Sequence, residues 1–578
     1  MVTLKINDIE VKVEEGTTIL NAAKSIGVKI PTLCHLDLHE VHFHNKLAAC
    51  RVCVVEQVGT SKLIPACATV CKEGMEILTD SYKAVTARRT IVELLLSNHP
   101  NSCLTCPRNL DCELQAIAHD LGIREIEYEG EKCDFPIDNN SYSIVRDQNK
   151  CILCKRCLHM CSEIQTCGAL TNIGRGFYTS VGSAFNKPMA ETTCTFCGQC
   201  LAVCPTGALT EVSNINKVWS AFNRKKHVFV QTAPAVRVAI GEEFGLPPGT
   251  PATGKMVAAL RKLGFEKVFD TDFAADLTIM EEATEFVDRF QNGGKLPILT
   301  SCCPSWVNFF EHFFTDMLDI PSSAKSPHEM FGAVAKTYLA KKLNINHEDI
   351  ILVSVMPCVA KKYEAARSEL ENKAGDRDVD IVITTRELAV MIKEMGINFL
   401  ELEDEEFDDP MGESTGAGVI FGATGGVIEA TIRSAYHMIT GDDLQEIEFT
   451  SLRGINGIKE ATVDIKGTPI NIAVANGLGN ARHLLNSIRN GEKHYDAIEI
   501  MACPGGCIGG AGQPYHHGNL EILRKRAEGL YTEDRMKEKR RSYENEQLKN
   551  LYEQFLGYPG SPRAHELLHT SYEAKPRH

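Results

Sequence analysis

The chain has 578 residues, too many for one folded domain, and this length indicates about four domains of ordinary size. Its net charge of −15 argues against nucleic acid as a partner, because nucleic-acid-binding proteins present a basic face. The sequence has no apolar run long enough to predict a membrane-spanning helix. The N-terminal segment lacks the basic and apolar regions of a signal peptide, so we expect a cytoplasmic protein.

Residues 1–80 are predicted to form a ferredoxin-like β-grasp domain. The stretch TLKINDIEVKV alternates apolar and polar residues around Asn7-Asp8, which predicts a β-hairpin, and a short amphipathic helix follows it. The odd total of 23 cysteines does not indicate a disulfide framework in a chain expected to be cytoplasmic. We therefore interpret the first cysteine group as the ligands of one 2Fe-2S cluster, with structural zinc as the alternative: Cys34, Cys50, Cys53 and Cys67.

Residues 81–135 contain a helical pattern followed by one histidine and three cysteines. On spacing alone this group could be a zinc site. It lies between two predicted redox domains, however, so we interpret it as a 4Fe-4S cluster in which an imidazole replaces one thiolate. Such a replacement removes a negative charge and raises the reduction potential. The proposed ligands are His99, Cys103, Cys106 and Cys112.

Residues 136–215 contain an internal repeat, because CILCKRCLHMC and CTFCGQCLAVCP share the spacing C-x2-C-x2-C-x3-C. This spacing is typical of ferredoxins with two 4Fe-4S clusters, in which the fourth cysteine of each copy binds the other cluster. Zinc also binds paired cysteines, but two tandem copies disfavour it. The predicted ligand sets are Cys151, Cys154, Cys157 and Cys204 for one cluster, and Cys194, Cys197, Cys200 and Cys161 for the other.

Residues 216–578 alternate short β-branched runs with helical stretches, which predicts an α/β domain with largely parallel strands and a charged, helical C-terminal tail. Three of the runs end just before Cys302-Cys303, Cys358 and Cys503. Ligands of open α/β sheets bind at the carboxyl ends of the strands, so we expect the ends of these strands to bring the cysteines together. The fold class predicted for the whole chain is therefore multidomain α/β.

Three motifs in this last region closely resemble the signature motifs of FeFe hydrogenases: LTSCCPSW, VMPCVAKKYEA and EIMACPGGCIGGAGQP. The resemblance covers essentially the whole chain, including the four earlier groups in the same order. It implies an H-cluster, which is a 4Fe-4S cluster bridged through a cysteine sulfur to a di-iron unit with CO, cyanide and azadithiolate ligands. The implied ligands are Cys303, Cys358, Cys503 and the bridging Cys507.

The resemblance also implies a proton route that starts at the Cys302 thiol. A thiol can pass a proton when carboxyl groups lie within reach. Glu282, Glu285 and Arg289 are spaced to share one helix face. On spacing alone, a solvated helix face explains these charges, and the resemblance favours the proton route. The implied route consists of Cys302, Glu282, Ser322, Glu285 and Arg289.

Other positions match residues around the diatomic ligands of the H-cluster. Lys361 is the implied hydrogen-bond donor to a cyanide ligand, and the residues implied to pack around the di-iron unit are Pro234, Met356 and Met501. Taken alone, each methionine would be an ordinary core residue. The chain departs from many members at two positions, where Ala235 replaces serine and His328 replaces glutamine.

The resemblance implies an enzyme that interconverts H2 with protons and electrons, in which the accessory clusters carry the electrons. Subgroup similarities in VQTAPAVRVAIGEEFGLPPGT and GQPYHHG favour the hydrogen-reacting subunit of an NAD(P)-linked, electron-bifurcating enzyme. Since no nucleotide-binding motif is evident, we expect flavin, NAD(P) and a further 2Fe-2S cluster on partner subunits, with ferredoxin as a second electron partner. The alternatives are a stand-alone ferredoxin-dependent hydrogenase and a non-catalytic iron-sulfur electron-transfer subunit.

Overall fold

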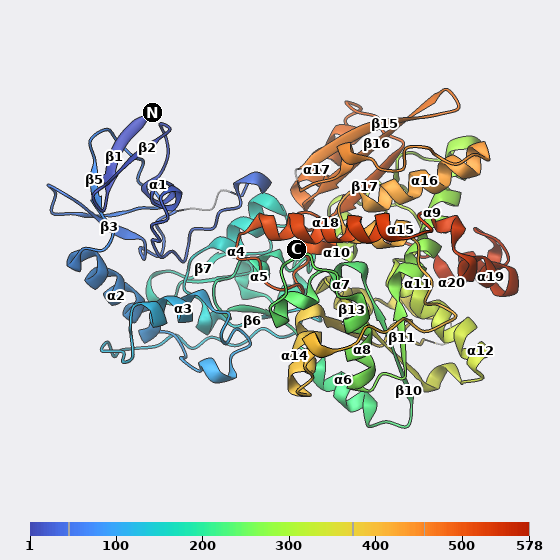
Figure 1. Ribbon diagram of the computed structural model, residues 1–578, viewed down its shortest axis with the longest axis horizontal. Coiled ribbons are helices and arrows are strands. Elements are labelled where there is room, and N and C mark those ends of the chain that lie inside the picture. Colours follow the sequence, from blue (N-terminus) through green and yellow to red (C-terminus); the bar gives the residue numbers. More distant parts are fainter. Residues whose placement is uncertain (44–46, 373–374, 456, 577–578) are drawn as a thin grey trace.

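The structure, a computed structural model, describes residues 1–43, 47–372, 375–455 and 457–576. Figure 1 shows the N-terminal third of the chain on one side of a larger body formed by the remaining residues. Within the described residues, no helix is long and apolar enough to cross a membrane.

The N-terminal segment forms a mixed five-stranded sheet in the order β2-β1-β5-β3-β4. The predicted hairpin is confirmed, because β1 and β2 pair antiparallel around Asn7 and Asp8, whose φ angles of 47° and 65° suit a tight two-residue turn. Helix α1 (Ile19–Ser25) begins where the Thr18 side chain accepts a hydrogen bond from the Asn21 N–H. The strands are β1 (Val2–Ile6), β2 (Ile9–Val13), β3 (Val54–Gln57), β4 (Leu63–Pro65) and β5 (Glu76–Leu78).

The two copies of the cysteine repeat adopt the same local backbone. Each copy enters a short helix through a residue with positive φ, namely Lys155 (65°) before α4 and Gly198 (71°) before α5. The loops before these helices are irregular, so their backbone N–H groups are not used in helix or sheet hydrogen bonds. The elements of this middle region are α2 (Tyr82–Ser97), α3 (Glu113–Asp120), β6 (Ile144–Arg146), α4 (Arg156–His159), β7 (Thr171–Ile173), β8 (Ser180–Gly182), α5 (Gln199–Ala202) and β9 (Leu209–Glu211).

The larger body contains two four-stranded sheets. The first has the order β11-β10-β13-β14 and is parallel throughout. Its strands are buried almost completely, as the near-continuous apolar runs in the sequence require. Its elements are α6 (Ile215–Phe222), β10 (His227–Thr232), α7 (Pro234–Arg237), α8 (Thr253–Leu263), β11 (Lys267–Asp270), α11 (Pro327–Val334), α12 (Ala340–Leu343), β13 (Ile350–Met356), α13 (Ala360–Glu364), β14 (Ile381–Thr384) and α14 (Thr385–Glu394).

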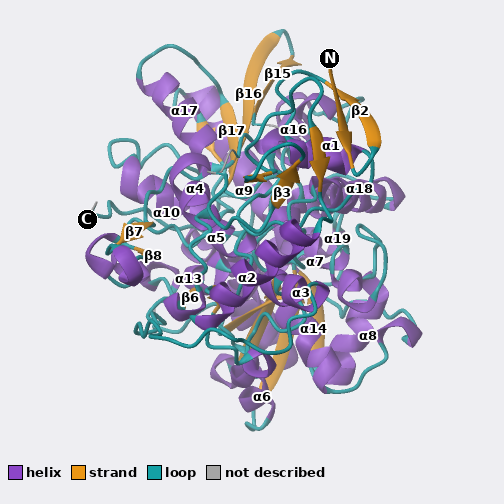
Figure 2. Ribbon diagram, turned by 90° about the vertical axis from the view of Figure 1, so that its left-hand side faces the viewer, coloured by secondary structure: helices purple, strands orange, loops and turns teal. Residues whose placement is uncertain are grey.

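The second sheet has the order β12-β17-β16-β15, and its β15-β16 pair is an antiparallel hairpin that the sequence patterns did not predict. Figure 2 shows β15, β16 and β17 at the top, far from α6 and α14 of the first sheet. The other elements are α9 (Thr271–Asn292), β12 (Ile298–Leu299), α10 (Pro304–Phe313), α15 (Gly416–Val419), α16 (Gly426–Thr440), β15 (Ile458–Ile465), β16 (Thr468–Asn476), α17 (Leu478–Arg489) and β17 (Ala497–Met501).

The cysteine-bearing strands belong to different sheets. β12 and β17, which precede Cys302-Cys303 and Cys503, are neighbours in the second sheet, whereas β13, which precedes Cys358, lies in the first. The sequence patterns could not assign strands to sheets, because all three runs are equally apolar. The carboxyl ends of both sheets therefore bring the cysteines together.

The C-terminal segment covers the junction of the two sheets. Helix α18 (Leu520–Met536) runs between them in Figure 1, and α19 (Glu546–Leu551) and α20 (Pro562–Leu568) follow it. The helical tail was predicted, but the chain after α20 is extended rather than helical. This extended segment binds the larger body, since the Thr570 N–H donates a 2.7 Å hydrogen bond to the Ser323 carbonyl.

Candidate functional site

The first cysteine group lies together in the N-terminal domain. The side chain of Cys34 contacts those of Cys50 and Cys67, and Cys67 also contacts Cys53. The Ala48 N–H points at the Cys67 sulfur at 3.4 Å, as N–H groups do around thiolate ligands. These four sulfurs could hold one small cluster. Cys71 lies in the same core, and burial raises the pKa of its thiol.

His99 has a ring nitrogen suited to a metal. Its Nε2 atom is buried and has no hydrogen-bond partner among the described residues, while its Nδ1 atom lies 3.4 Å from the Asn101 N–H. Burial lowers the pKa of this imidazole, so it is held neutral and can donate a lone pair. Burial raises the pKa of Cys112, and the nearby Cys106 thiol raises it further. The group therefore fits a metal centre with one imidazole ligand.

The tandem repeat forms two separate sets of four cysteines. Burial raises the pKa of Cys154 most, and the neighbouring thiols of Cys204 and Cys151 raise it further. Burial likewise raises the pKa of Cys194 most, followed by the neighbouring Cys161 thiol. Cys204 thus lies beside the cysteines of the first copy, and Cys161 lies beside those of the second copy. The geometry therefore favours the exchange of the fourth cysteine that the spacing predicts.

The five cysteine groups form a continuous series through the protein. Cys34 and Cys50 pack in one apolar cluster with Cys154, which joins the first group to the repeat. The His99 group reaches the same set from another side, because the Cys112 sulfur lies 3.6 Å from the carbonyl of Pro205, the residue after Cys204.

At the other end of the series, the repeat meets the larger body. Burial raises the pKa of Cys197, and the thiol of Cys303 contributes to that rise. Gly198 is required at this contact, because a Cβ atom there would lie 2.5 Å from the Val359 Cγ2 atom, next to Cys358. The repeat is therefore packed directly against the last cysteine group.

That last group consists of Cys303, Cys358, Cys503 and Cys507, and all four thiols are desolvated. Burial raises the pKa of Cys503 well above its ordinary value, and Cys358 and Cys303 raise it further. A Cβ atom at Gly510 would lie 2.3 Å from the Pro357 carbonyl, so the glycines of this loop permit its close approach to the Cys358 loop. Four mutually close, desolvated sulfur atoms would be costly as free thiolates, and a metal cluster would compensate their charge.

A cavity of about 60 Å³ adjoins these cysteines. Its walls come from the ends of strands in both sheets and from α7, α13 and the segment 420–422. Several sequence-predicted residues line it: Pro234, Ala235, Cys302, Met356, Cys358, Lys361 and Cys507. Met501 lies beside it, where it packs with Cys302 and Phe421 in one apolar cluster. The cavity can hold a small group attached to Cys507, with Cys302 on its wall.

Lys361 lies in the wall of this cavity with its charge compensated. Its Nζ atom donates hydrogen bonds to Glu364 Oε2 at 2.6 Å and to the Cys302 carbonyl at 3.1 Å. Burial on its own lowers the pKa of Lys361, but Glu364 outweighs it and the pKa is raised. Lys361 therefore stays an ammonium group and can donate a hydrogen bond into the cavity.

Glu282 is the carboxyl group next to Cys302. Its Oε1 atom accepts a hydrogen bond from the Ser301 N–H at 3.3 Å and lies 3.4 Å from the Ser301 hydroxyl oxygen, whereas Oε2 has no partner among the described residues. Burial raises the pKa of Glu282 to about 8. Burial, followed by Glu282, also raises the pKa of Cys302. Both groups can therefore carry a proton near neutral pH.

Further along α9, the predicted residues continue toward the surface. Ser322 donates a 2.8 Å hydrogen bond to Glu285 Oε2, and Arg289 Nη2 lies 2.6 Å from Glu285 Oε1. Glu282 and Ser322 are buried, whereas Glu285 and Arg289 are partly exposed. Ser322, Glu285 and Arg289 are thus directly linked near the surface, and Glu282 lies close enough to both Cys302 and Glu285 to affect or feel their charge.

Two residues in this series escaped prediction. The Ser301 hydroxyl donates to the Ala324 carbonyl at 2.7 Å, and its oxygen lies 3.4 Å from Glu282 Oε1. The Tyr572 hydroxyl donates a 2.5 Å hydrogen bond to the Ser322 carbonyl. Ser301 precedes Cys302 and could have been noticed, but Tyr572 is 250 residues from Ser322 in the chain and gave no signal.

Models of known families match almost the whole chain. The iron only hydrogenase large subunit, C-terminal domain, matches residues 226–511, and the iron hydrogenase small subunit matches residues 520–575. Three iron-sulfur families match the N-terminal part: a 2Fe-2S iron-sulfur cluster binding domain at residues 1–82, the NADH-ubiquinone oxidoreductase-G iron-sulfur binding region at 88–127, and the NADH-quinone oxidoreductase subunit 3 ferredoxin-like domain at 142–210.

Individual proteins are similar over the same length. The NADP-reducing hydrogenase subunit HndD of Solidesulfovibrio fructosivorans is 55% identical over 100% of both chains. Iron hydrogenase 1 of Clostridium pasteurianum is 42% identical over 99% of this chain and 100% of its own length. Among solved structures, a variant of the FeFe hydrogenase HydA1 from Chlamydomonas reinhardtii is 42% identical and covers 63% of this chain and 99% of its own, with a TM-score of 0.57.

Proposed function

The chain belongs to the iron-only, or FeFe, hydrogenase family and is an oxidoreductase acting on H2, and we propose that it is the hydrogen-reacting subunit of a multisubunit NAD(P)-linked hydrogenase. The observation that carries the reaction is the cavity beside Cys507, with Cys302 and Lys361 in its wall. The similarity to an NADP-reducing hydrogenase subunit over the full length of both chains supports the multisubunit assignment.

The cofactor proposed for the cavity is the H-cluster. Cys303, Cys358, Cys503 and Cys507 would hold it, and their desolvated, mutually close thiols fit this cluster. When bound, the H-cluster supplies the iron chemistry that cleaves or forms the H–H bond. Pro234, Ala235, Met356 and Met501 would enclose it and exclude water, and the Lys361 ammonium group would donate a hydrogen bond to it from the cavity wall.

The chain's own groups move the proton. The Cys302 thiol, buried in the cavity wall, accepts or delivers the proton at its sulfur. Glu282 exchanges that proton through its unpaired Oε2 atom, and a pKa of about 8 lets it change protonation state near neutral pH. Ser322 and Glu285 continue the route, and Arg289 holds the Glu285 carboxylate in place at the surface.

The other cysteine groups provide an electron route with a branch point. We propose one 2Fe-2S cluster and three accessory 4Fe-4S clusters at the predicted ligands. The set around Cys154 is the branch point, because the Cys34 group and the His99 group both adjoin it. The set around Cys197 then connects it to the H-cluster ligands. A branched route suits an enzyme that exchanges electrons with two different partners.

The finer assignments are also proposals. We assign a β-grasp 2Fe-2S domain to residues 1–80, a His/Cys3 cluster domain to 81–135, a two-cluster ferredoxin domain to 136–215, and the H-cluster domain with its tail to 216–578. The partners proposed are subunits that carry flavin, NAD(P) and a 2Fe-2S cluster, together with ferredoxin. A cytoplasmic location remains a prediction.

In the decisive experiment, the chain is isolated together with its partner subunits and supplied with H2. Three conditions are compared: NAD+ or NADP+ as the acceptor, ferredoxin as the acceptor, and both acceptors together. Reduction of a nicotinamide cofactor supports the multisubunit assignment, and reduction only when both acceptors are present identifies electron bifurcation. Rapid ferredoxin reduction by the isolated chain, without stable partners, supports the second candidate, a stand-alone hydrogenase. Iron hydrogenase 1 of Clostridium pasteurianum, which is 42% identical over 99% of this chain, is not named as a subunit, and this similarity is the reason to test the second candidate.

A further inference from the structure

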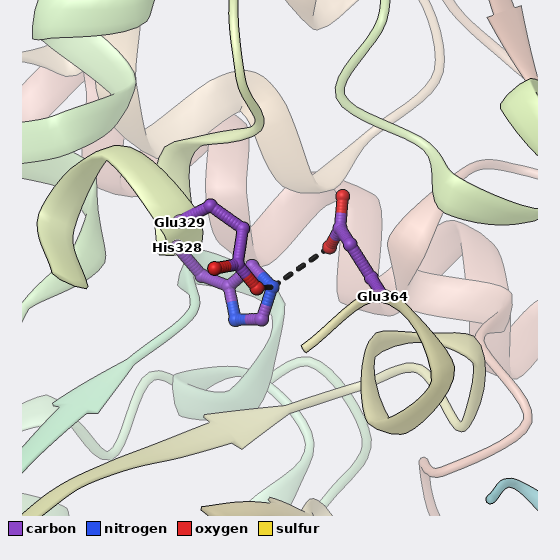
Figure 3. Close-up of side chains that lie close together, drawn as sticks. All are labelled: His328, Glu329 and Glu364. Carbon is purple, nitrogen blue, oxygen red and sulfur yellow. Dashed lines mark hydrogen bonds and ion pairs between the residues drawn. The ribbon is translucent and has the colours of Figure 1, made fainter. Parts of the chain in front are cut away.

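A buried cluster of four charged side chains lies behind the cavity wall. His328 at the start of α11 faces Glu329 on the same helix and Glu364 at the end of α13, as Figure 3 shows. Its Nε2 atom is 2.8 Å from Glu329 Oε1 and 2.7 Å from Glu364 Oε2. Glu364 Oε2 also accepts the 2.6 Å hydrogen bond from Lys361. One carboxylate oxygen is thus shared by His328 and Lys361.

The position of His328 is fixed from the strand side of the helix. Its carbonyl accepts a 2.9 Å hydrogen bond from the Gln231 side chain, which also donates to the Ser354 hydroxyl at 2.8 Å. Gln231 lies on β10 and Ser354 on β13, so both central strands hold the start of α11. These contacts hold the backbone of His328 in place, and the imidazole is held by the two carboxylates that face it.

The charges in the cluster balance only if His328 is an imidazolium. Two carboxylates face two cationic groups when His328 and Lys361 are both protonated, whereas a neutral imidazole would leave one buried negative charge uncompensated. Burial on its own lowers the pKa of His328, but Glu329 and Glu364 outweigh both burial and the Lys361 charge, so the pKa lies above its ordinary 6.5. Glu329 also faces Asp378, whose charge is compensated by Lys325 at 2.8 Å.

The same geometry could suggest a metal site, since the nitrogen and oxygen atoms of His328, Glu329 and Glu364 lie within 4.8 Å of one another. A metal ion would have to displace the Lys361 ammonium from Glu364, and it would meet the protonated Nε2 atom. Because two cations already neutralise two anions, the cluster is complete as an ion-pair network. The charge balance favours this interpretation over a metal.

We propose that His328 is a positioning residue for the hydrogen reaction, which shares the Glu364 carboxylate with Lys361 and thereby leaves the Lys361 ammonium available to the cavity. With His328 protonated, Glu364 is neutralised from two sides, and Lys361 can direct a hydrogen toward a ligand in the cavity. When His328 loses its proton, Glu364 attracts Lys361 more strongly and draws its charge away from the cavity. Only the effect on the H-cluster rests on the proposed function.

The first test measures the protein without the di-iron unit. His328→Gln removes the titrating group and keeps a hydrogen-bond donor. A raised folded-state pKa gives stability that is complete below the unfolded value and is lost as pH rises through the folded value. The wild type should therefore exceed H328Q in unfolding temperature at about pH 6, and this difference should shrink by about pH 9. The control His227→Gln replaces a partly exposed histidine at the start of β10, outside this cluster, and shows how far a histidine-to-glutamine change by itself alters the unfolding temperature.

The second test records infrared bands of the diatomic ligands in the loaded enzyme as a function of pH. The wild type should show a step in band position above about pH 6.5, and H328Q should lack it.

 Glu329→Gln leaves one carboxylate beside His328 and should move the step to lower pH without abolishing it.

The outcomes separate the two proposals. An unchanged infrared step in H328Q, or a stability difference that does not vary with pH, would overturn the role of His328. If H328Q fails to fold, the shifted step in Glu329→Gln decides the question, and an unshifted step contradicts the proposal. If the wild type shows the pH-dependent stability but never reacts with H2, the ion-pair network stands and the proposed function fails.

Discussion

The Glu282 carboxyl group accepts a hydrogen bond from the Ser301 N–H at 3.3 Å, one residue before Cys302, and its other oxygen has no partner among the described residues. The group is held by one oxygen and is free to exchange a proton at the other. Burial raises its pKa to about 8, so it is mostly protonated at neutral pH. This relationship links the cavity to the rest of the proton route.

Glu282→Gln should abolish most of the turnover while the iron content stays unchanged. The amide keeps the shape of the carboxyl group but cannot exchange a proton, and loss of a positioned acid–base group costs about 10²–10⁴-fold in rate. H2 oxidation with an artificial electron acceptor measures the effect. Glu281→Gln is the matched control, because Glu281 is equally buried on α9 but pairs with Tyr552 and His569 instead. Turnover near the wild-type rate in E282Q would exclude Glu282 from the route.

The same substitution should change how stability depends on pH. A carboxyl group whose pKa is raised from 4.5 to about 8 binds more protons in the folded state than in the unfolded state between these values. Its contribution to stability therefore falls as pH rises through this window. The unfolding temperature of E282Q relative to wild type should thus increase between about pH 5 and about pH 8. A constant difference would show that Glu282 does not titrate in this range.

Substitutions of the two adjacent cysteines should have opposite signatures. Cys302→Ala should keep the iron content and lose nearly all turnover, because it removes the proton carrier and no metal ligand. Cys303→Ala should lose iron, because it removes a proposed ligand of the H-cluster. Iron analysis together with H2 oxidation distinguishes the two. Iron loss in Cys302→Ala and not in Cys303→Ala would show that the roles are reversed.

His99→Cys should keep the iron content and lower the reduction potential of one accessory cluster. A thiolate adds a negative charge where the neutral imidazole had none, which stabilises the oxidised cluster. A redox titration followed by electron paramagnetic resonance measures the shift, and His119→Gln, an exposed histidine on α3, serves as a control. If the group holds zinc, the substitution will leave every iron-sulfur signal where it is.

The sequence predicted the local structure well where spacing determines it. The hairpin around Asn7-Asp8 and the single helix that carries Glu282, Glu285 and Arg289 are both confirmed. The association of the three cysteine-bearing strands with two different sheets was not predictable, because apolar runs do not specify their partners.

The candidate site shows the same limit. The cysteine groups could be read from short spacings, and the proton route came from family resemblance. Tyr572 lies in a segment with no such pattern, and only the folded chain brings it to Ser322. Glu364 belongs to the motif VMPCVAKKYEA, but its contact with His328, 36 residues away, was not predictable from that motif. Contacts between residues far apart in sequence depend on the packing of whole elements, which local periodicity does not encode.

The central claim is that this chain splits H2 at the cavity beside Cys507 and passes the proton through Cys302. Isotope exchange between D2 and H2O tests it most directly, because exchange needs no electron acceptor and no partner subunit. The chain with a complete H-cluster should form HD and H2, and Cys302→Ala with the same iron content should not. A fully loaded wild-type chain that catalyses no exchange would contradict the account.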